Sequence, residues 1–273
     1  MPSELVNKYY RTENLPHIWC PGCGNGIVTR AIVKAIDTLA LDKNNVCIIS
    51  GIGCSSRAPG YLDFNTLHTT HGRALAFATG IKLANPGLEI IVVTGDGDSS
   101  AIGGNHLIHA CRRNIDLTTI VFNNYTYGMT GGQYSPTTPT GEKGTTAPYG
   151  SIDPSFDLCD LSAAAGATYV ARGTIYAVKM LEKNIVEAIQ NKGFSLVDVF
   201  TTCPTYFGRK NKKGSAVDMV TFLKENAVNV AAWDKLPEEK KEGKFAIGKL
   251  HEKIRPEYTK AYDKLIESLA KGD

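Results

Sequence analysis

Short apolar runs alternate with longer amphipathic segments along most of the chain, and this alternation predicts strands interspersed with helices. Residues 25–40 place their apolar side chains on one helical stripe, and residues 174–193 repeat with the same period up to a glycine. The runs between such segments are short and continuously apolar, as buried strands of a parallel sheet are. Further helices are predicted over 72–87, 100–114 and 158–165, and strands over 45–50, 89–98, 117–124, 168–171 and 194–200.

This order of elements indicates the fold class α/β, with a mainly parallel sheet and helices on both faces. One domain is predicted over residues 1–215. The segment 125–157 is rich in Gly, Thr, Pro and Tyr and is predicted to be a loop, and loops of this length are usually functional or disordered. Residues 216–273 are charged and weakly amphipathic, so we expect a helical extension that wraps the domain or meets a partner.

The composition is that of a soluble globular protein, because 42% of the 273 residues are hydrophobic and 21% are charged. No apolar run approaches the roughly 18 residues that span a bilayer, so no membrane association is expected. The first residues contain no apolar segment typical of a signal peptide, which favours a cytoplasmic protein. A net charge of +3 is too small to indicate binding to nucleic acid.

The strand predicted over 89–98 runs into a Gly-Asp-Gly turn that carries Asp96 and Asp98. In parallel sheets, ligands bind beyond the carboxyl ends of the strands, and Asn124 ends the next predicted strand. Asp96 and Asn124 should therefore converge on one ion, and Mg²⁺ commonly shares such oxygen ligands with a diphosphate. Taken alone, Gly-Asp-Gly can equally be a tight turn that binds nothing.

The segment from Gly95 to Asn124 spans 30 residues and resembles the binding motif for thiamine diphosphate (TPP). The resemblance implies that Mg²⁺ is held by Asp96, Asn124 and the backbone carbonyl of Thr126. It also implies that a second group of residues lines the diphosphate, namely Gly95, Gly97, Asp98, Gly128 and Met129.

Seven cysteines in a chain without a secretion signal favour reduced thiols over a disulfide framework. Cys20 and Cys23 form a close pair, whereas Cys54 and Cys203 each follow a predicted strand. Four thiolates can hold a 4Fe–4S cluster. A structural zinc site and a redox dithiol stay open as alternatives, although zinc ribbons usually supply two close pairs. The other cysteines lie in apolar patterns and should be buried: Cys47, Cys111 and Cys159.

Most of residues 15–211 is similar to the β subunit of 2-oxoacid:ferredoxin oxidoreductases. The similarity runs from LPHIWCPGCGNG (15–26) through NNYTYGMTGGQYSPTTP (123–139) to TTCPTYFGRKN (201–211). It implies that a 4Fe–4S cluster is bound by four thiolates, those of Cys20, Cys23, Cys54 and Cys203. It also implies that TPP contacts a further set of residues: Ile52, Gly53, Cys54, Ser55 and His71.

By this resemblance the chain binds TPP, Mg²⁺ and one 4Fe–4S cluster, and its enzyme decarboxylates a 2-oxoacid oxidatively. Electrons then pass singly to ferredoxin and the acyl group to coenzyme A, or the reaction runs in reverse. An α subunit is expected to supply the glutamate that activates TPP. The expected substrate is 2-oxoglutarate, because Arg57 could reach its distal carboxylate; pyruvate and branched-chain 2-oxoacids are the alternatives. Arg57 could equally contact a partner or tune the potential of the cluster.

Further histidines and basic residues are candidates for a role near the predicted site. His71, in the family-like context HTTHGR, is a catalytic candidate together with Arg57, whereas His106 and His109 are expected to support packing or the pocket. The basic segment GRKNKKG (208–214) is either a docking site for an acidic ferredoxin or a solvated loop.

Two other function classes remain open: a non-redox TPP lyase or transferase, and a zinc-stabilised nucleotide-binding module without catalysis.

Overall fold

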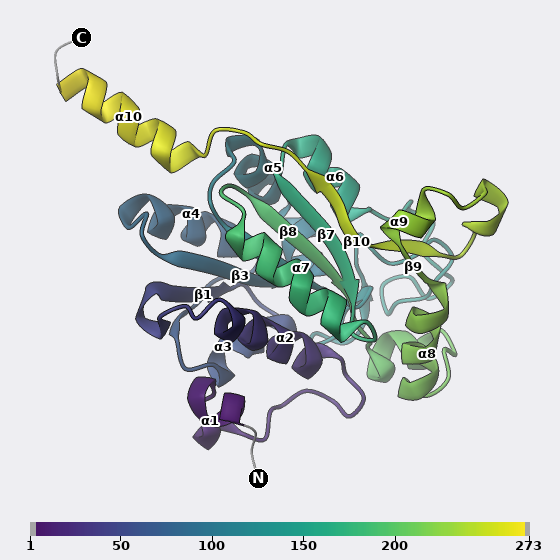
Figure 1. Cartoon of the computed structure of the whole chain (residues 1–273). Coiled ribbons are helices and arrows are strands. Elements are labelled where there is room, and N and C mark those ends of the chain that lie inside the picture. Colours follow the sequence, from purple (N-terminus) through teal and green to yellow (C-terminus); the bar gives the residue numbers. More distant parts are fainter. Residues whose placement is uncertain (1–3, 271–273) are drawn as a thin grey trace.

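The centre of the molecule is an eight-stranded sheet with helices on both faces (Figure 1), as seen in a computed structural model that describes residues 4–270. The strands lie in the order β2-β1-β3-β4-β8-β7-β10-β9, and every neighbouring pair is parallel except β7 and β10. The predicted α/β class is therefore confirmed. The strands are β1 (Val46–Ser50), β2 (Asn65–His68), β3 (Glu89–Gly95), β4 (Thr118–Asn123), β7 (Tyr169–Thr174), β8 (Ser195–Phe200), β9 (Ala227–Asn229) and β10 (Phe245–Glu252).

Two layers of helices enclose this sheet. Helices α2 (Asn25–Thr38) and α7 (Val178–Gln190) pack on one face, whereas α4 (Ala74–Ala84), α5 (Gly104–Arg113) and α6 (Leu158–Ala165) pack on the other. These five helices correspond to the predicted ones, with ends that differ by a few residues. The short helices α1 (Glu4–Tyr9) and α3 (Ala58–Tyr61) lie on the same side as α2 (Figure 1).

Strand β3 illustrates how the sequence forms two cores at once. Successive side chains of a strand point to opposite faces of the sheet. Ile91 and Val93 accordingly pack into the core beneath α2 and α7, whereas Ile90 and Val92 pack into the core beneath α4 and α5. A strand buried on both faces is continuously apolar, which explains why the short apolar runs predicted the central strands.

The helix predicted over 100–114 begins differently from the expectation. A π-helical turn, η4 (Asp98–Ile102), precedes α5 and widens the backbone just after β3. The turn places the side chains of Asp98, Ser99 and Ser100 in buried positions. Wide turns of this kind occur mostly at functional sites.

The extension predicted to be helical over 216–273 also contributes strands to the sheet. It contains α8 (Ala216–Asn226), α9 (Val230–Trp233) and the projecting helix α10 (Tyr258–Ala270), but also β9 and β10. Strand β10 pairs with β7 through a bulge between Lys249 and His251. Its sequence mixes exposed polar with buried apolar residues, so no clear strand period was available to predict it.

The long loop over 125–157 contains a small hairpin of β5 (Thr126–Tyr127) and β6 (Gln133–Tyr134). This hairpin stands next to the carboxyl end of β4, and β4 is flanked by β3 and β8. The segments that leave β1, β3, β4 and β8 therefore emerge side by side at one edge of the sheet. Within residues 4–270, none of the helices combines the length and apolar character needed to cross a bilayer.

Candidate cofactor site

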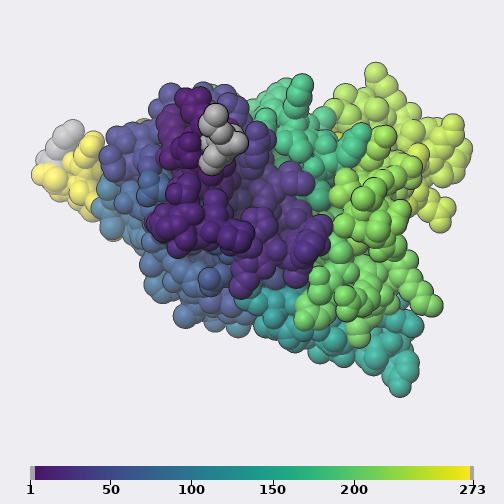
Figure 2. All heavy atoms as spheres, turned by 90° about the horizontal axis from the view of Figure 1, so that it is seen from below, coloured from purple at the N-terminus to yellow at the C-terminus, as the bar shows by residue number. Residues whose placement is uncertain are grey.

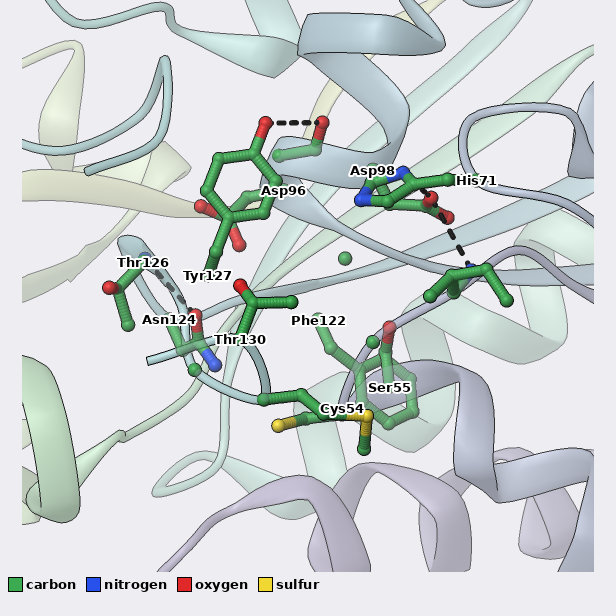
Figure 3. Close-up of a pocket in the computed structure, with 16 residues that line it drawn as sticks. Cys54, Ser55, His71, Asp96, Asp98, Phe122, Asn124, Thr126, Tyr127 and Thr130 are labelled. Atoms are coloured by element: carbon green, nitrogen blue, oxygen red, sulfur yellow. Dashed lines mark hydrogen bonds and ion pairs between the residues drawn. The ribbon is translucent and has the colours of Figure 1, made fainter. Parts of the chain in front are cut away.

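A cavity lies at the edge of the sheet where these segments emerge (Figure 3). All ten residues expected to contact TPP line it, and so do Asp96, Asn124 and Thr126, which were expected to bind Mg²⁺. Parallel pairing explains the convergence, because β1, β3 and β4 are adjacent and end at the same edge. The structure adds three lining residues that the sequence analysis missed: Phe122, Tyr127 and Thr130.

Asp98 is buried and joins three of the segments around the cavity. Its Oδ1 atom accepts hydrogen bonds from the backbone N–H groups of Gly72, at 2.7 Å, and Ile52, at 3.4 Å. Its Oδ2 atom accepts one from the Thr94 hydroxyl at 2.9 Å. His71 Nδ1 lies 2.6 Å from Oδ1, which is the distance of an ion pair. These contacts occupy Asp98 fully, so its carboxylate holds the cavity wall.

Asp96 is also buried but is bound differently. One of its oxygens, Oδ2, accepts hydrogen bonds from the hydroxyls of Ser135, at 2.5 Å, and Thr137, at 2.6 Å. Burial raises the pKa of Asp96, and the two hydroxyl bonds and the backbone N–H of Asn124 oppose that rise. A divalent cation beside a carboxylate favours its charged form. Asp96 can therefore serve as a cation ligand.

Asn124 and Thr126 lie near Asp96 on the segment that follows β4. Both are buried, and Asn124 Oδ1 accepts a hydrogen bond of 3.2 Å from the Thr126 N–H. Together with Asp96 they bring carboxylate, amide and carbonyl oxygens to one wall of the cavity, which suits Mg²⁺. Ser55 adds a buried hydroxyl in the same cavity that has no partner within the described residues, so it is available to a ligand.

Tyr127 closes the cavity on the side of the Gly-Asp-Gly turn. Its hydroxyl donates to the carbonyl of Gly97 at 3.1 Å, and its ring lies 6.0 Å from that of His71. A Cβ atom at Gly97 would overlap the Tyr127 ring. The glycine therefore allows this close approach. The sequence signal for Tyr127 was only its position in the segment after Asn124.

The four cysteines predicted to act together come from three segments. Burial raises the pKa of the Cys23 thiol to about 12 and that of Cys54 to about 11, and it also raises the pKa of Cys203. The charges of neighbouring cysteines within this group of four raise each of these pKa values further by smaller amounts. The Cys54 and Cys203 sulfurs lie only 3.3 and 3.6 Å from the point that a Cβ atom on Gly128 would occupy. Cys20 is exposed.

Hydrogen bonds tie these cysteine segments to one another. Trp19 Nε1 donates to the carbonyl of Cys54 at 2.7 Å, and the Thr202 hydroxyl donates to the carbonyl of Gly22 at 2.9 Å. Figure 2 shows the N-terminal segment, in purple, packed beside the green residues around α8, where Gly22 contacts Ala216. Hydrogen bonds within the protein therefore hold the three cysteine segments together.

Side-chain geometry within residues 4–270 provides no group of three or more His, Cys, Asp or Glu side chains close enough to hold a single metal ion. Thiolates around one zinc ion lie about 2.3 Å from it, so they are close to one another. The thiolates of a cubane bind different irons and are spaced more widely. Within the described residues the four thiols therefore do not form a compact site for a single ion.

The remaining predicted residues lie away from this cavity. Arg57 is exposed and is not among the residues that line it. His106 and His109 lie on α5, and burial lowers the pKa of His106. Cys47, Cys111 and Cys159 are buried in the core beneath α4, α5 and α6, as expected.

Comparison with known proteins adds independent findings. Residues 51–199 match the thiamine pyrophosphate enzyme family, in its C-terminal TPP binding domain. The chain is 54% identical to the 2-oxoglutarate synthase subunit KorB of Methanocaldococcus jannaschii, over 96% of this chain and 97% of that protein. It is 50% identical to the 2-oxoacid:ferredoxin oxidoreductase subunit beta of Saccharolobus solfataricus, over 69% of this chain and 62% of that protein.

A solved structure is also similar over nearly the whole chain. It is the 2-oxoglutarate:ferredoxin oxidoreductase from Magnetococcus marinus with 2-oxoglutarate, coenzyme A and succinyl-CoA bound. The TM-score is 0.86 at 32% sequence identity, over 99% of this chain and 92% of that chain. The similarity therefore includes the strands of the C-terminal segment as well as the cavity.

The contact between Gly97 and Tyr127 yields a direct test of the cavity wall. We expect Gly97→Ala to displace the Tyr127 ring, because the added methyl group would overlap it. Overpacking costs about 1–3 kcal/mol, and we expect TPP affinity, measured by calorimetry, to fall about 10-fold. Gly80→Ala is the control, since Gly80 lies exposed in α4 with open space around it. Unchanged TPP affinity in Gly97→Ala would contradict the assignment of Gly97 to the wall.

Proposed function

The chain belongs to the family of 2-oxoglutarate synthase KorB and 2-oxoacid:ferredoxin oxidoreductase β subunits, and from this premise we propose that it is the TPP-binding subunit of a 2-oxoglutarate-oxidising enzyme. The reaction releases CO₂ and joins the remaining acyl group to coenzyme A. Its two electrons pass one at a time through a 4Fe–4S cluster to ferredoxin, and the reverse reaction uses the same site. The names of the relatives favour 2-oxoglutarate over pyruvate or branched-chain 2-oxoacids.

The observation that carries this proposal is the position of two thiols beside the cavity. Gly128 and Cys54 both line the cavity, and the sulfurs of Cys54 and Cys203 lie 3.3 and 3.6 Å from the point that a Cβ atom on Gly128 would occupy. A cluster on these thiols would therefore lie directly beside the cavity. Such proximity suits transfer of single electrons, which a non-redox lyase or transferase would not need.

Bound TPP would supply the carbanion that adds to the 2-oxo carbon and takes up the electrons left after loss of CO₂. Asp96, Asn124 and the Thr126 carbonyl would hold Mg²⁺. The unpartnered Ser55 hydroxyl would donate to the ligand. His71 lines the cavity with its Nδ1 atom 2.6 Å from Asp98 Oδ1, so its ring would contact the bound cofactor.

A partner subunit is required in this proposal. The carboxylate that activates TPP is expected on the α subunit, and the cavity of this chain is open beside exposed apolar side chains. Met129 at the cavity and Ile102 beside Gly72 are about half exposed. Exposed apolar residues at the rim of a site commonly mark a protein contact. We therefore expect the isolated chain not to decarboxylate 2-oxoacids at full rate.

The cluster assignment is tested by substituting the four cysteines singly. We expect Cys20→Ala, Cys23→Ala, Cys54→Ala and Cys203→Ala each to lose visible absorption and most of the iron from anaerobically purified protein, because a cubane uses four ligands. Cys47→Ala is the control, since Cys47 is buried in a core that contains none of the four proposed ligands. The Cys47→Ala variant should contain as much iron as the wild type, about four atoms per chain.

Other outcomes of this measurement identify the competing classes. Colourless protein with zinc in place of iron would favour a zinc-stabilised module. Colourless protein that releases TPP on denaturation would favour a non-redox TPP lyase or transferase. Either result in the wild-type protein contradicts the proposal.

Arg57 is proposed as a contact to the distal carboxylate of 2-oxoglutarate, reached when the α subunit closes over this exposed side chain. Hydrogen bonds to charged groups contribute about 1.5–3 kcal/mol. We therefore expect Arg57→Ala in the complete enzyme to lower kcat/KM for 2-oxoglutarate by about 100-fold and to leave turnover of pyruvate unchanged. An equal loss on both substrates would instead assign Arg57 to a subunit contact.

The basic segment after Cys203 is proposed to dock ferredoxin. Lys210 and Lys212 are exposed, whereas Lys213 forms an ion pair of 2.5 Å with Glu142. Reversing the charge of Lys210 and Lys212 should raise the KM for ferredoxin about 10-fold at low salt, with little change at high salt, because steering by exposed charges is screened. The control is the double variant Lys260→Glu/Lys264→Glu, which makes the same change in charge on α10, away from the cysteines. Equal effects of both double variants would exclude a local docking site.

A further inference from the structure

Three buried hydroxyl groups surround the proposed Mg²⁺ ligands from the loop that follows them in sequence. Ser135, Thr137 and Thr138 belong to one tight turn, in which the Thr138 N–H donates to the Ser135 carbonyl at 3.0 Å. All three side chains are almost completely buried. A polar side chain that loses water must find a partner in the protein, so the partners of these hydroxyls identify what the turn does.

Two of the hydroxyls converge on a single oxygen atom. Ser135 Oγ and Thr137 Oγ1 both donate to Asp96 Oδ2, at 2.5 and 2.6 Å. The two hydroxyl oxygens are 3.1 Å apart. Two donors on the same oxygen restrain the carboxylate, and neither uses Oδ1. The side chain is therefore held in one orientation with its second oxygen available.

The third hydroxyl fixes the other half of the ligand set. Thr138 Oγ1 donates to the backbone carbonyl of Tyr125 at 2.6 Å and accepts from the Ser135 N–H at 2.8 Å. Tyr125 lies between Asn124 and Thr126, and its φ of 63° is left-handed, which is uncommon for a residue other than glycine. The bond from Thr138 therefore holds the bend that presents Asn124 and Thr126 to the cavity.

We propose that Ser135, Thr137 and Thr138 are positioning residues, which set Asp96 and the Asn124–Thr126 segment in the geometry that Mg²⁺ requires. The inference rests on the proposed function, because it takes that ligand set as its starting point. It adds a role for a turn that does not itself line the cavity. Mg²⁺ demands near-ideal octahedral geometry, so ligands fixed before binding raise the affinity of the site.

The same contacts make the cation site and the loop interdependent. The turn lies at the end of the β5–β6 hairpin, and the segment between its two strands carries Gly128 and Met129 of the cavity wall. Thr126 Oγ1 donates to the Gln133 carbonyl at 2.8 Å across this hairpin. Loss of the bonds to Asp96 would therefore loosen the wall as well as the carboxylate.

The test measures cation affinity directly, with Mn²⁺ as the probe. The complete enzyme, freed of metal and TPP by chelation, is titrated with Mn²⁺ in the presence of TPP while free Mn²⁺ is followed by electron paramagnetic resonance. Removing a group that orients a metal ligand commonly weakens affinity 10- to 100-fold. We expect Ser135→Ala and Thr137→Val each to weaken Mn²⁺ binding about 10-fold, and Thr137→Ser to restore it. In turnover, the KM for Mg²⁺ should rise far more than kcat falls.

Thr140→Val provides the matched control, because the Thr140 hydroxyl belongs to the same loop but donates to the Asp153 carbonyl at an exposed position. It should bind Mn²⁺ like the wild type. Equal Mn²⁺ affinity in wild type, Ser135→Ala and Thr137→Val would overturn the inference. If Thr137→Val does not fold, Ser135→Ala and Thr137→Ser alone decide it. A wild-type enzyme that binds neither Mn²⁺ nor TPP would instead contradict the proposed function.

Discussion

The buried carboxylate of Asp98 is the contact on which the rest of the site depends. The segments after β1 and β3 and the turn at Gly72 have no strand pairing with one another at the cavity, and Asp98 joins them through N–H and hydroxyl donors. A buried carboxylate is costly unless it is hydrogen-bonded, so the folded chain is most stable when all of these segments are in place. Cavity shape and local stability are therefore coupled at one side chain.

Asp96 differs from Asp98 although only one residue separates them in sequence. Both are buried after β3, yet Asp98 is bound mainly by backbone groups on the side of β1, whereas Asp96 faces the hydroxyls of the loop after β4. The Gly97 backbone between them approaches Tyr127 closely. One carboxylate thus stabilises the wall, and the other retains an oxygen for a ligand, because the turn sends their side chains toward different segments.

Sequence patterns predicted the central strands and the flanking helices, because continuous apolar runs depend on local chemistry. The ten residues expected to contact TPP came from the resemblance to the family, and all ten line the cavity. Tyr127 was missed because its contact with Gly97 arises from a positive-φ bend at Tyr125 that has no simple residue signature. Strand β10 was missed because it is bulged and pairs with a strand far away in sequence. Arg57 was placed near the site from its spacing to Cys54, but the chain turns into α3 and leaves the side chain exposed.

Gly128 lies next to both the cavity and two of the cysteine thiols. A side chain there would meet the sulfurs of Cys54 and Cys203, and Gly128 lines the cavity together with Cys54. Cys54 also belongs to the segment that Asp98 fixes through Ile52, and its sulfur faces the N–H of Met129, which lowers the pKa of the thiol against the effect of burial. The thiols and the cavity therefore share their supporting contacts, so a change in this loop would alter both together.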